Sequence, residues 1–98
     1  MEMEYYTVEE LIKRRDELGF INVANKSTGF YGIYLGRDPQ TGIYVTGYVT
    51  YSWDECDYYT QNIGKNKKKK FKTFEDALFF ATYGRIPFKE IVRFKKIN

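Results

Sequence analysis

Two helix-start signatures flank a long stretch in which apolar and polar residues alternate, and this order leaves few folds open. The first signature, Thr7-Val-Glu-Glu10, fits a capping box, in which each of the two side chains accepts a hydrogen bond from the backbone amide of the other residue. Apolar residues then recur at helical spacing up to Gly19, which suits a left-handed helix end. The pattern predicts a helix over residues 8–18.

The second signature, Thr73-Phe-Glu-Asp76, opens another run of apolar residues at helical spacing. It predicts a helix over residues 74–83 that ends at Gly84. After Pro87 the apolar residues of segment 88–97 suit a strand as well as a helix, and we expect a strand.

Between the two helices the hydrophobic period is two, as in half-buried strands. Turn-forming clusters divide this stretch into predicted strands near residues 20–24, 30–37, 43–53 and 57–63. Short connections favour pairing between sequential strands. We therefore expect one small α+β domain over residues 1–98. Its sheet is an antiparallel meander of about four strands, with a fifth if 88–97 is a strand. Two helices pack on one face, in the order α-β-β-β-β-α-(β).

The predicted strand 43–53 has two different faces. Alternation groups Ile43, Val45, Val49, Tyr51 and Trp53 on one face, and Tyr44, Thr46, Tyr48, Thr50 and Ser52 on the other. The first group is expected to face the core and the second to face outward. The full predicted core comprises Val8, Leu11, Ile12, Leu18, Ile33, Leu35, Val45, Val49, Phe74, Leu78 and Ala81.

A lysine run dominates the charge pattern. Six of the eight residues in 65–72 are lysines, and residues 65–98 carry eleven Lys and Arg against three Asp and Glu, a net charge of +8. Residues 1–64 carry five against ten, a net charge of −5. We expect a flexible lysine-rich loop at about 64–72 whose phosphate contacts are Lys65, Lys67, Lys68, Lys69, Lys70 and Lys72. The alternative is a solvated loop that like-charge repulsion keeps extended.

Tyrosines provide the second candidate surface. Tyr34, Tyr44, Tyr48 and Tyr58 are expected on the non-core side of the meander, where they form a row beside the lysines. Such a row can stack unpaired bases, and it can equally serve as a protein interface. A third interpretation is that these tyrosines only stabilise strand pairing.

Composition excludes several kinds of catalysis. The chain has no histidine, which excludes Ser-His-Asp and Cys-His catalysis and zinc sites that contain histidine. A single cysteine, Cys56, excludes a four-cysteine metal site and an internal disulfide framework. The acidic segment Asp54-Glu-Cys-Asp57 is interpreted as a polar hairpin turn rather than a magnesium or acid–base site. We expect no enzyme, no cofactor and no metal.

The same features bear on location. No apolar run approaches the ~20 residues of a membrane span, and the acidic start MEMEYY does not resemble a secretory signal. We therefore expect a cytoplasmic protein with no membrane contact and no disulfide-linked partner. Abundant Lys, Asn, Ile and Tyr suit an AT-rich genome, such as that of a bacterium, a phage or another mobile element.

Two segments resemble known families. Gly32-Ile-Tyr34 and Tyr44-Val-Thr-Gly47 look like the paired strands of GIY-YIG nucleases, but the spacing differs by one residue and the catalytic arginine helix and metal-binding glutamate have no counterpart, so a nuclease is rejected. The layout of Ile33–Gly42 followed by Phe71–Ala77 is similar to the arm-binding domain of phage-type integrases, which binds DNA with a three-stranded sheet. That likeness covers about half of the chain. It favours DNA binding without assigning a family.

The sequence thus predicts a small nucleic-acid-binding accessory module, with lysines on phosphates and tyrosines on bases. Because lysine neutralises phosphate without reading base edges, we expect backbone contacts rather than sequence recognition. The choice between DNA and RNA stays open. The alternative is a small protein-binding regulator or inhibitor that uses the tyrosine-rich face.

Overall fold

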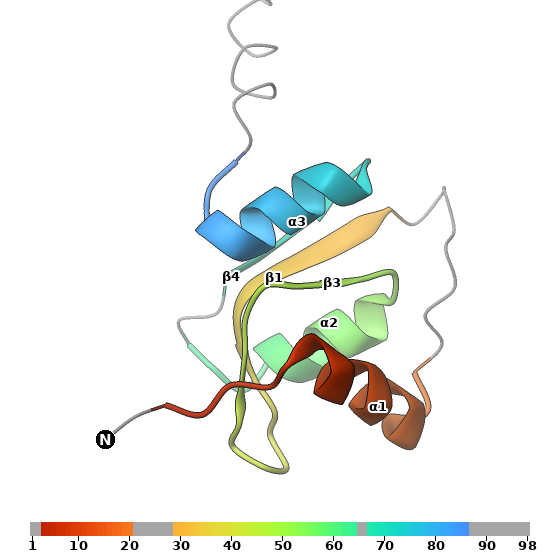
Figure 1. The fold of residues 1–98 in the computed structure, drawn as a ribbon, viewed down its shortest axis with the longest axis vertical. Coiled ribbons are helices and arrows are strands. Elements are labelled where there is room, and N and C mark those ends of the chain that lie inside the picture. Colours follow the sequence, from red (N-terminus) through yellow and green to blue (C-terminus); the bar gives the residue numbers. More distant parts are fainter. Residues whose placement is uncertain (1–2, 21–28, 65–66, 87–98) are drawn as a thin grey trace, which may run out of the picture.

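A computed structural model describes residues 3–20, 29–64 and 67–86, and it contains three helices and one antiparallel sheet of four strands (Figure 1). The elements are α1 (Val8–Leu18), β1 (Phe30–Arg37), β2 (Tyr44–Val45), β3 (Tyr48–Thr50), α2 (Trp53–Thr60), β4 (Lys67–Phe71) and α3 (Phe74–Tyr83). The predicted α+β class is confirmed, with the first helix, four strands and last helix in the expected order. Residues 21–24 of the predicted strand 20–24 and the whole predicted strand 88–97 lie outside the described residues.

The two predicted helices form for the local reasons that the sequence indicated. Thr7 and Glu10 make the reciprocal capping-box hydrogen bonds at the start of α1, and Gly19 ends the helix with φ +80°. Thr73 caps α3 by accepting from the amide of Asp76, and Gly84 ends that helix in the same left-handed conformation.

Strand β1 is the centre of the sheet. Its residues 31–33 pair with both β3 and β4, so these two strands lie on opposite sides of β1. Gly36 lies opposite Val45 and Ile33 lies opposite Tyr48, so β2 and β3 pair with β1 in the same register on either side of Gly47. Strands β2 and β3 therefore act as one strand that Gly47, with φ +66°, interrupts.

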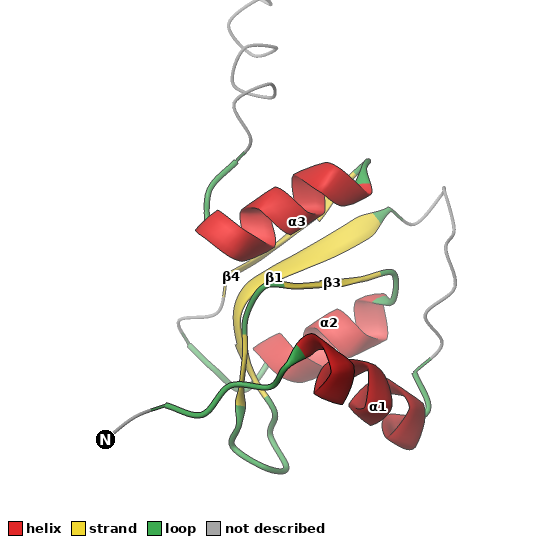
Figure 2. Cartoon of the chain, viewed as in Figure 1, coloured by secondary structure: helices red, strands yellow, loops and turns green. Residues whose placement is uncertain are grey.

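Helices cover both faces of the sheet rather than one, as Figure 2 shows. On one side, α1 and α2 pack with Ile33, Val45 and Tyr48 in a buried cluster. On the other side, α3 packs against Phe71, with Tyr34 and Val49 partly buried beside it.

The alternation of the third strand was predicted wrongly. Tyr48 is only 4% exposed and shares a cluster with Val45, three residues earlier, whereas Val49 packs on the opposite, α3 side. A regular strand places residues three apart on opposite faces. The break at Gly47 resets the alternation, and helices on both faces give each set of side chains a place to pack.

Four of the predicted core residues are fully buried: Leu11, Ile33, Val45 and Ala81. Leu18, Leu35 and Val49 are half-buried. The other four are 41–51% exposed, so their assignment to the core was wrong: Val8, Ile12, Phe74 and Leu78. Trp53, also placed on the core face by alternation, is 50% exposed.

Helix α2 replaces the strand predicted at 57–63. Ser52 accepts a hydrogen bond from the amide of Glu55, and Asp54 adds a second acidic residue to the first turn. The segment interpreted as an acidic hairpin turn is therefore the start of a helix. The high strand propensity of Tyr58 and Tyr59 led to the prediction of a strand. The prediction was wrong because capping and packing outweigh the propensity of single residues.

Candidate nucleic-acid interface

The lysine run forms an edge strand instead of the expected flexible loop. All five residues of β4, Lys67–Phe71, pair with β1 between Phe30 and Leu35. The pairing has one irregularity, between Ile33 and Leu35. Among the described strands β1 is the only partner of β4, so the other side of β4 is an edge of the sheet. Lys72 follows the strand and is exposed, and Lys65 lies outside the described residues.

Pairing orders the lysines because a strand sends successive side chains to opposite faces. On the α3 face, the ammonium group of Lys67 lies 5.7 Å from the centre of the Tyr34 ring, and that of Lys69 lies 5.9 Å from the Phe71 ring. The ammonium groups thus lie over aromatic rings, as in cation–π contacts, while Lys67 and Lys69 remain exposed.

The other face carries a set of four side chains that we call the Trp53 cluster: Tyr31, Trp53, Lys68 and Lys70. The Lys68 ammonium lies 4.7 Å from the indole ring and donates a 2.9 Å hydrogen bond to Thr60. The Lys70 ammonium lies 5.9 Å from the Tyr31 ring, whose centre is 5.7 Å from that of Trp53. Strands β1 and β4 and the first residue of α2 meet here, at the edge of the sheet.

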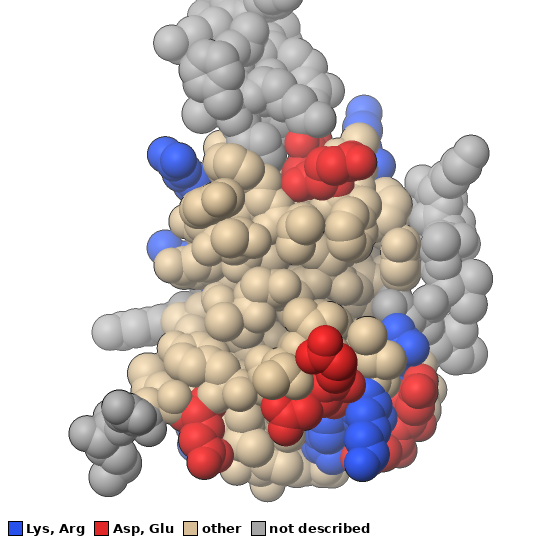
Figure 3. Space-filling model, in the orientation of Figure 1, with Lys and Arg blue, Asp and Glu red and all other residues tan. Residues whose placement is uncertain are grey.

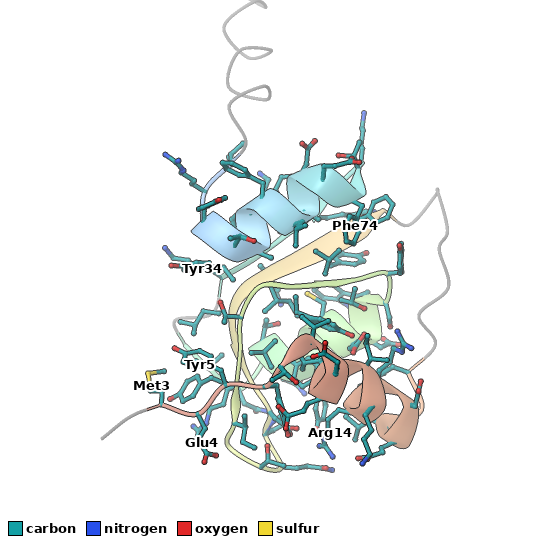
Figure 4. All side chains as sticks on the ribbon, in the orientation of Figure 1. Met3, Glu4, Tyr5, Arg14, Tyr34 and Phe74 are labelled. Carbon is teal, nitrogen blue, oxygen red and sulfur yellow. The ribbon has the colours of Figure 1, made fainter. Side chains whose placement is uncertain are left out.

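The structure does not bring the four predicted tyrosines together. Tyr34 is half-buried against α3, and Figure 4 shows it beside the end of that helix. Tyr44 is half-buried on β2, where its ring contacts Tyr5 and Arg37.

Neither of the other two tyrosines is free to stack a base as expected. Tyr48 lies in the core, and its hydroxyl donates a 2.8 Å hydrogen bond to the Glu55 carboxylate. Tyr58 is on α2, and its hydroxyl donates to Asp38 over 3.0 Å. The predicted tyrosine row therefore does not exist as one surface.

Glu55 is a buried carboxylate that sequence reasoning missed. Its side chain is fully buried and accepts hydrogen bonds from Tyr48 and, at 2.6 Å, from the Thr50 hydroxyl. Burial raises the pKa of Glu55, and the two hydrogen bonds only partly offset that rise. The spacing Ser52-x-x-Glu55 could have indicated the helix start, although not the burial.

Burial also affects the neighbouring thiol, since it raises the pKa of Cys56 to about 12. A thiol held this far from ionisation is a poor nucleophile at neutral pH. Cys56 therefore acts as a core residue between α2 and the sheet.

A second buried carboxylate joins distant parts of the chain. Asp38 is fully buried and accepts hydrogen bonds from Arg14 (2.8 Å), Tyr6 (2.9 Å), Tyr58 and the Gln40 amide (2.8 Å). Burial alone would raise the pKa of Asp38, but these four donors outweigh it and lower the pKa. The network fixes α1 and α2 to the β1–β2 turn and is structural.

Charge is unevenly distributed over the surface. On the face shown in Figure 3, Asp and Glu side chains gather with Lys and Arg side chains over α1, and the described atoms between α1 and α3 form an uncharged band. Exposed apolar side chains of both helices belong to the described surface: Val8, Ile12, Phe74 and Leu78.

Comparison with protein-family models, curated proteins and solved structures found no match. The described helices are all too short or too polar to cross a lipid bilayer. Within the described residues, no three His, Cys, Asp or Glu side chains group closely enough to hold a metal ion.

Proposed function

We propose that the protein binds nucleic acid along edge strand β4, with phosphates held by Lys67, Lys69, Lys70 and Lys72. The observation that carries this proposal is the ordered display of four consecutive lysines on a sheet edge beside half-exposed Trp53. Lys68 is less exposed than its neighbours because Thr60 holds its ammonium group.

An ordered strand suits a polyanion better than the expected loop does. Lysines two residues apart on one face are separated by about 7 Å, so each face presents a regular row of charges. Pairing with β1 has already fixed the backbone of these residues, which reduces the entropy lost on binding. Lysine contacts neutralise phosphates without reading base edges, so the binding is independent of sequence.

Lysines on an edge strand have another well-founded use, since they discourage pairing with the edge of another sheet. Protein binding is therefore the second candidate function, and one observation favours it: an uncharged band lies between α1 and α3 on the face shown in Figure 3, and both helices carry exposed apolar side chains. That surface is distinct from β4, so variants can separate the two functions.

The proposal is tested by titrating labelled oligonucleotides with the full chain at several salt concentrations and measuring anisotropy. Phosphate contacts release counterions, so the logarithm of the affinity should fall linearly with the logarithm of the salt concentration. Random-sequence oligonucleotides of equal length should bind alike. Absence of binding at low salt would contradict the proposal and direct the search to the uncharged band.

A further inference from the structure

We infer that the site on β4 accepts single-stranded nucleic acid and that one unpaired base stacks on Trp53. This inference rests on the proposed function and adds the class of nucleic acid and the residue that distinguishes it. Trp53 is the chain's only tryptophan, and the fold places it next to the lysine strand although the two are distant in sequence.

The position of Trp53 is fixed before any ligand arrives. It is the first residue of α2, directly after the Ser52 cap, and its ring packs against Tyr31 at a tilt of 51°. Lys68, itself held by Thr60, contacts the same ring. Despite these contacts the side chain is 50% exposed, so ring surface remains open to a base. A pre-positioned aromatic side chain loses little conformational entropy on binding.

The chemistry of the Trp53 cluster selects unpaired bases. Bases in a duplex have both faces stacked and present only phosphates and groove edges to a sheet edge, whereas an unpaired base offers a free face to an aromatic ring. Lys68 and Lys70 lie on the same face of β4 as the indole ring. Lys68 is held by Thr60, so the exposed Lys70 is the cation of this face that can reach a phosphate next to a base stacked on the indole ring.

The experiment uses the full chain and two probes, a thymidine homopolymer and a duplex of the same length and label. Tryptophan fluorescence, excited at a wavelength that the ten tyrosines do not absorb, reports on Trp53 alone, while anisotropy of the label reports binding anywhere on the protein. We expect the single strand to bind more tightly than the duplex and to quench the tryptophan. Trp53→Ala should weaken single-strand binding about 5- to 150-fold and leave duplex binding unchanged, and Trp53→Phe should retain most of it.

Tyr83→Ala is the matched control, because Tyr83 is an aromatic residue with 59% exposure at the end of α3 and should have no effect. Equal salt-dependent binding of both probes without quenching would overturn the inference and leave the proposed function standing. If neither probe binds at low salt, the proposed function fails and the inference fails with it. Even if Trp53→Ala does not fold, quenching of Trp53 in the parent protein by the single strand, and not by the duplex, tests whether a base stacks on the ring.

Discussion

Inside the core, the Tyr48 hydroxyl donates a 2.8 Å hydrogen bond to the carboxylate of Glu55, seven residues later in the chain. The bond links β3 to the first turn of α2. The bond explains how a tyrosine can occupy a core position that alternation assigned to the surface: the buried hydroxyl has a carboxylate that accepts its hydrogen bond.

Loss of this hydroxyl should destabilise the protein. Tyr48→Phe leaves the Glu55 carboxylate with one donor fewer, which should lower the free energy of unfolding by about 1–3 kcal/mol in urea denaturation. Tyr59→Phe is the matched control, since the Tyr59 hydroxyl is buried without a hydrogen-bond partner in the described part of the protein. That variant should be neutral or stabilising. Equal losses in the two variants would show that the Tyr48–Glu55 bond contributes nothing.

Glu55 should make the protein less stable as pH rises above the ordinary titration range of glutamate. Because burial raises its pKa, the folded protein keeps the proton to a higher pH than the unfolded chain, whose glutamate titrates near 4.3. Stability linked to Glu55 is therefore greatest below that value and falls as pH rises through the folded pKa. Glu55→Gln should remove this fall from the free energies of unfolding measured between about pH 4 and 8. Parallel pH profiles for parent and variant would contradict the assignment.

Asp38 has the opposite dependence. Its pKa is lowered, so its contribution is present above the ordinary aspartate value of about 3.9 and is lost as pH falls through the folded pKa. Arg14→Ala removes a 2.8 Å ion pair and should cost about 1.5–3 kcal/mol at neutral pH, with a smaller difference from the parent in acid. Lys13→Ala, on an exposed position of α1, should have little effect at either pH. A loss for Arg14→Ala that is the same at both pH values would argue against the pairing with Asp38.

The contact between β1 and α3 requires a glycine. A Cβ atom at position 32 would overlap the carbonyl oxygen of Ala77, so Gly32→Ala must push helix and strand apart. We expect a loss of about 1–3 kcal/mol in the free energy of unfolding. Gly64→Ala is the control, because a Cβ there meets no atom within 4 Å. Unchanged stability of Gly32→Ala would show that α3 does not pack this closely.

The sequence was sufficient for the elements whose signals are local. Helix α1 follows from Thr7, Glu10 and Gly19, and β1 was predicted with its observed bounds, Phe30–Arg37. The start of α2 also carried a local signal, Ser52 with Glu55, but the neighbouring tyrosines favoured a strand. Single-residue propensity cannot decide between such competing signals.

The candidate site was less predictable because distant residues create it. A run of lysines has little strand propensity, and it becomes β4 only through pairing with β1 and contacts of its ammonium groups with aromatic rings. Trp53 joins the lysines through the fold, and no spacing in the sequence shows that contact. The lysines were therefore identified as candidates, whereas their aromatic partner was not.

The most direct measurement of the central claim is the salt dependence of single-strand affinity for two variants that lose the same charge. Lys69→Gln with Lys70→Gln removes one of the two positive charges from each face of β4, and Lys13→Gln with Arg85→Gln removes two exposed cations elsewhere. Each lost phosphate contact should reduce the slope of log affinity against log salt by about 0.7, so the β4 variant should lose about 1.4 while the control keeps the parent slope. Equal slopes for the β4 variant, the control and the parent would contradict binding along β4.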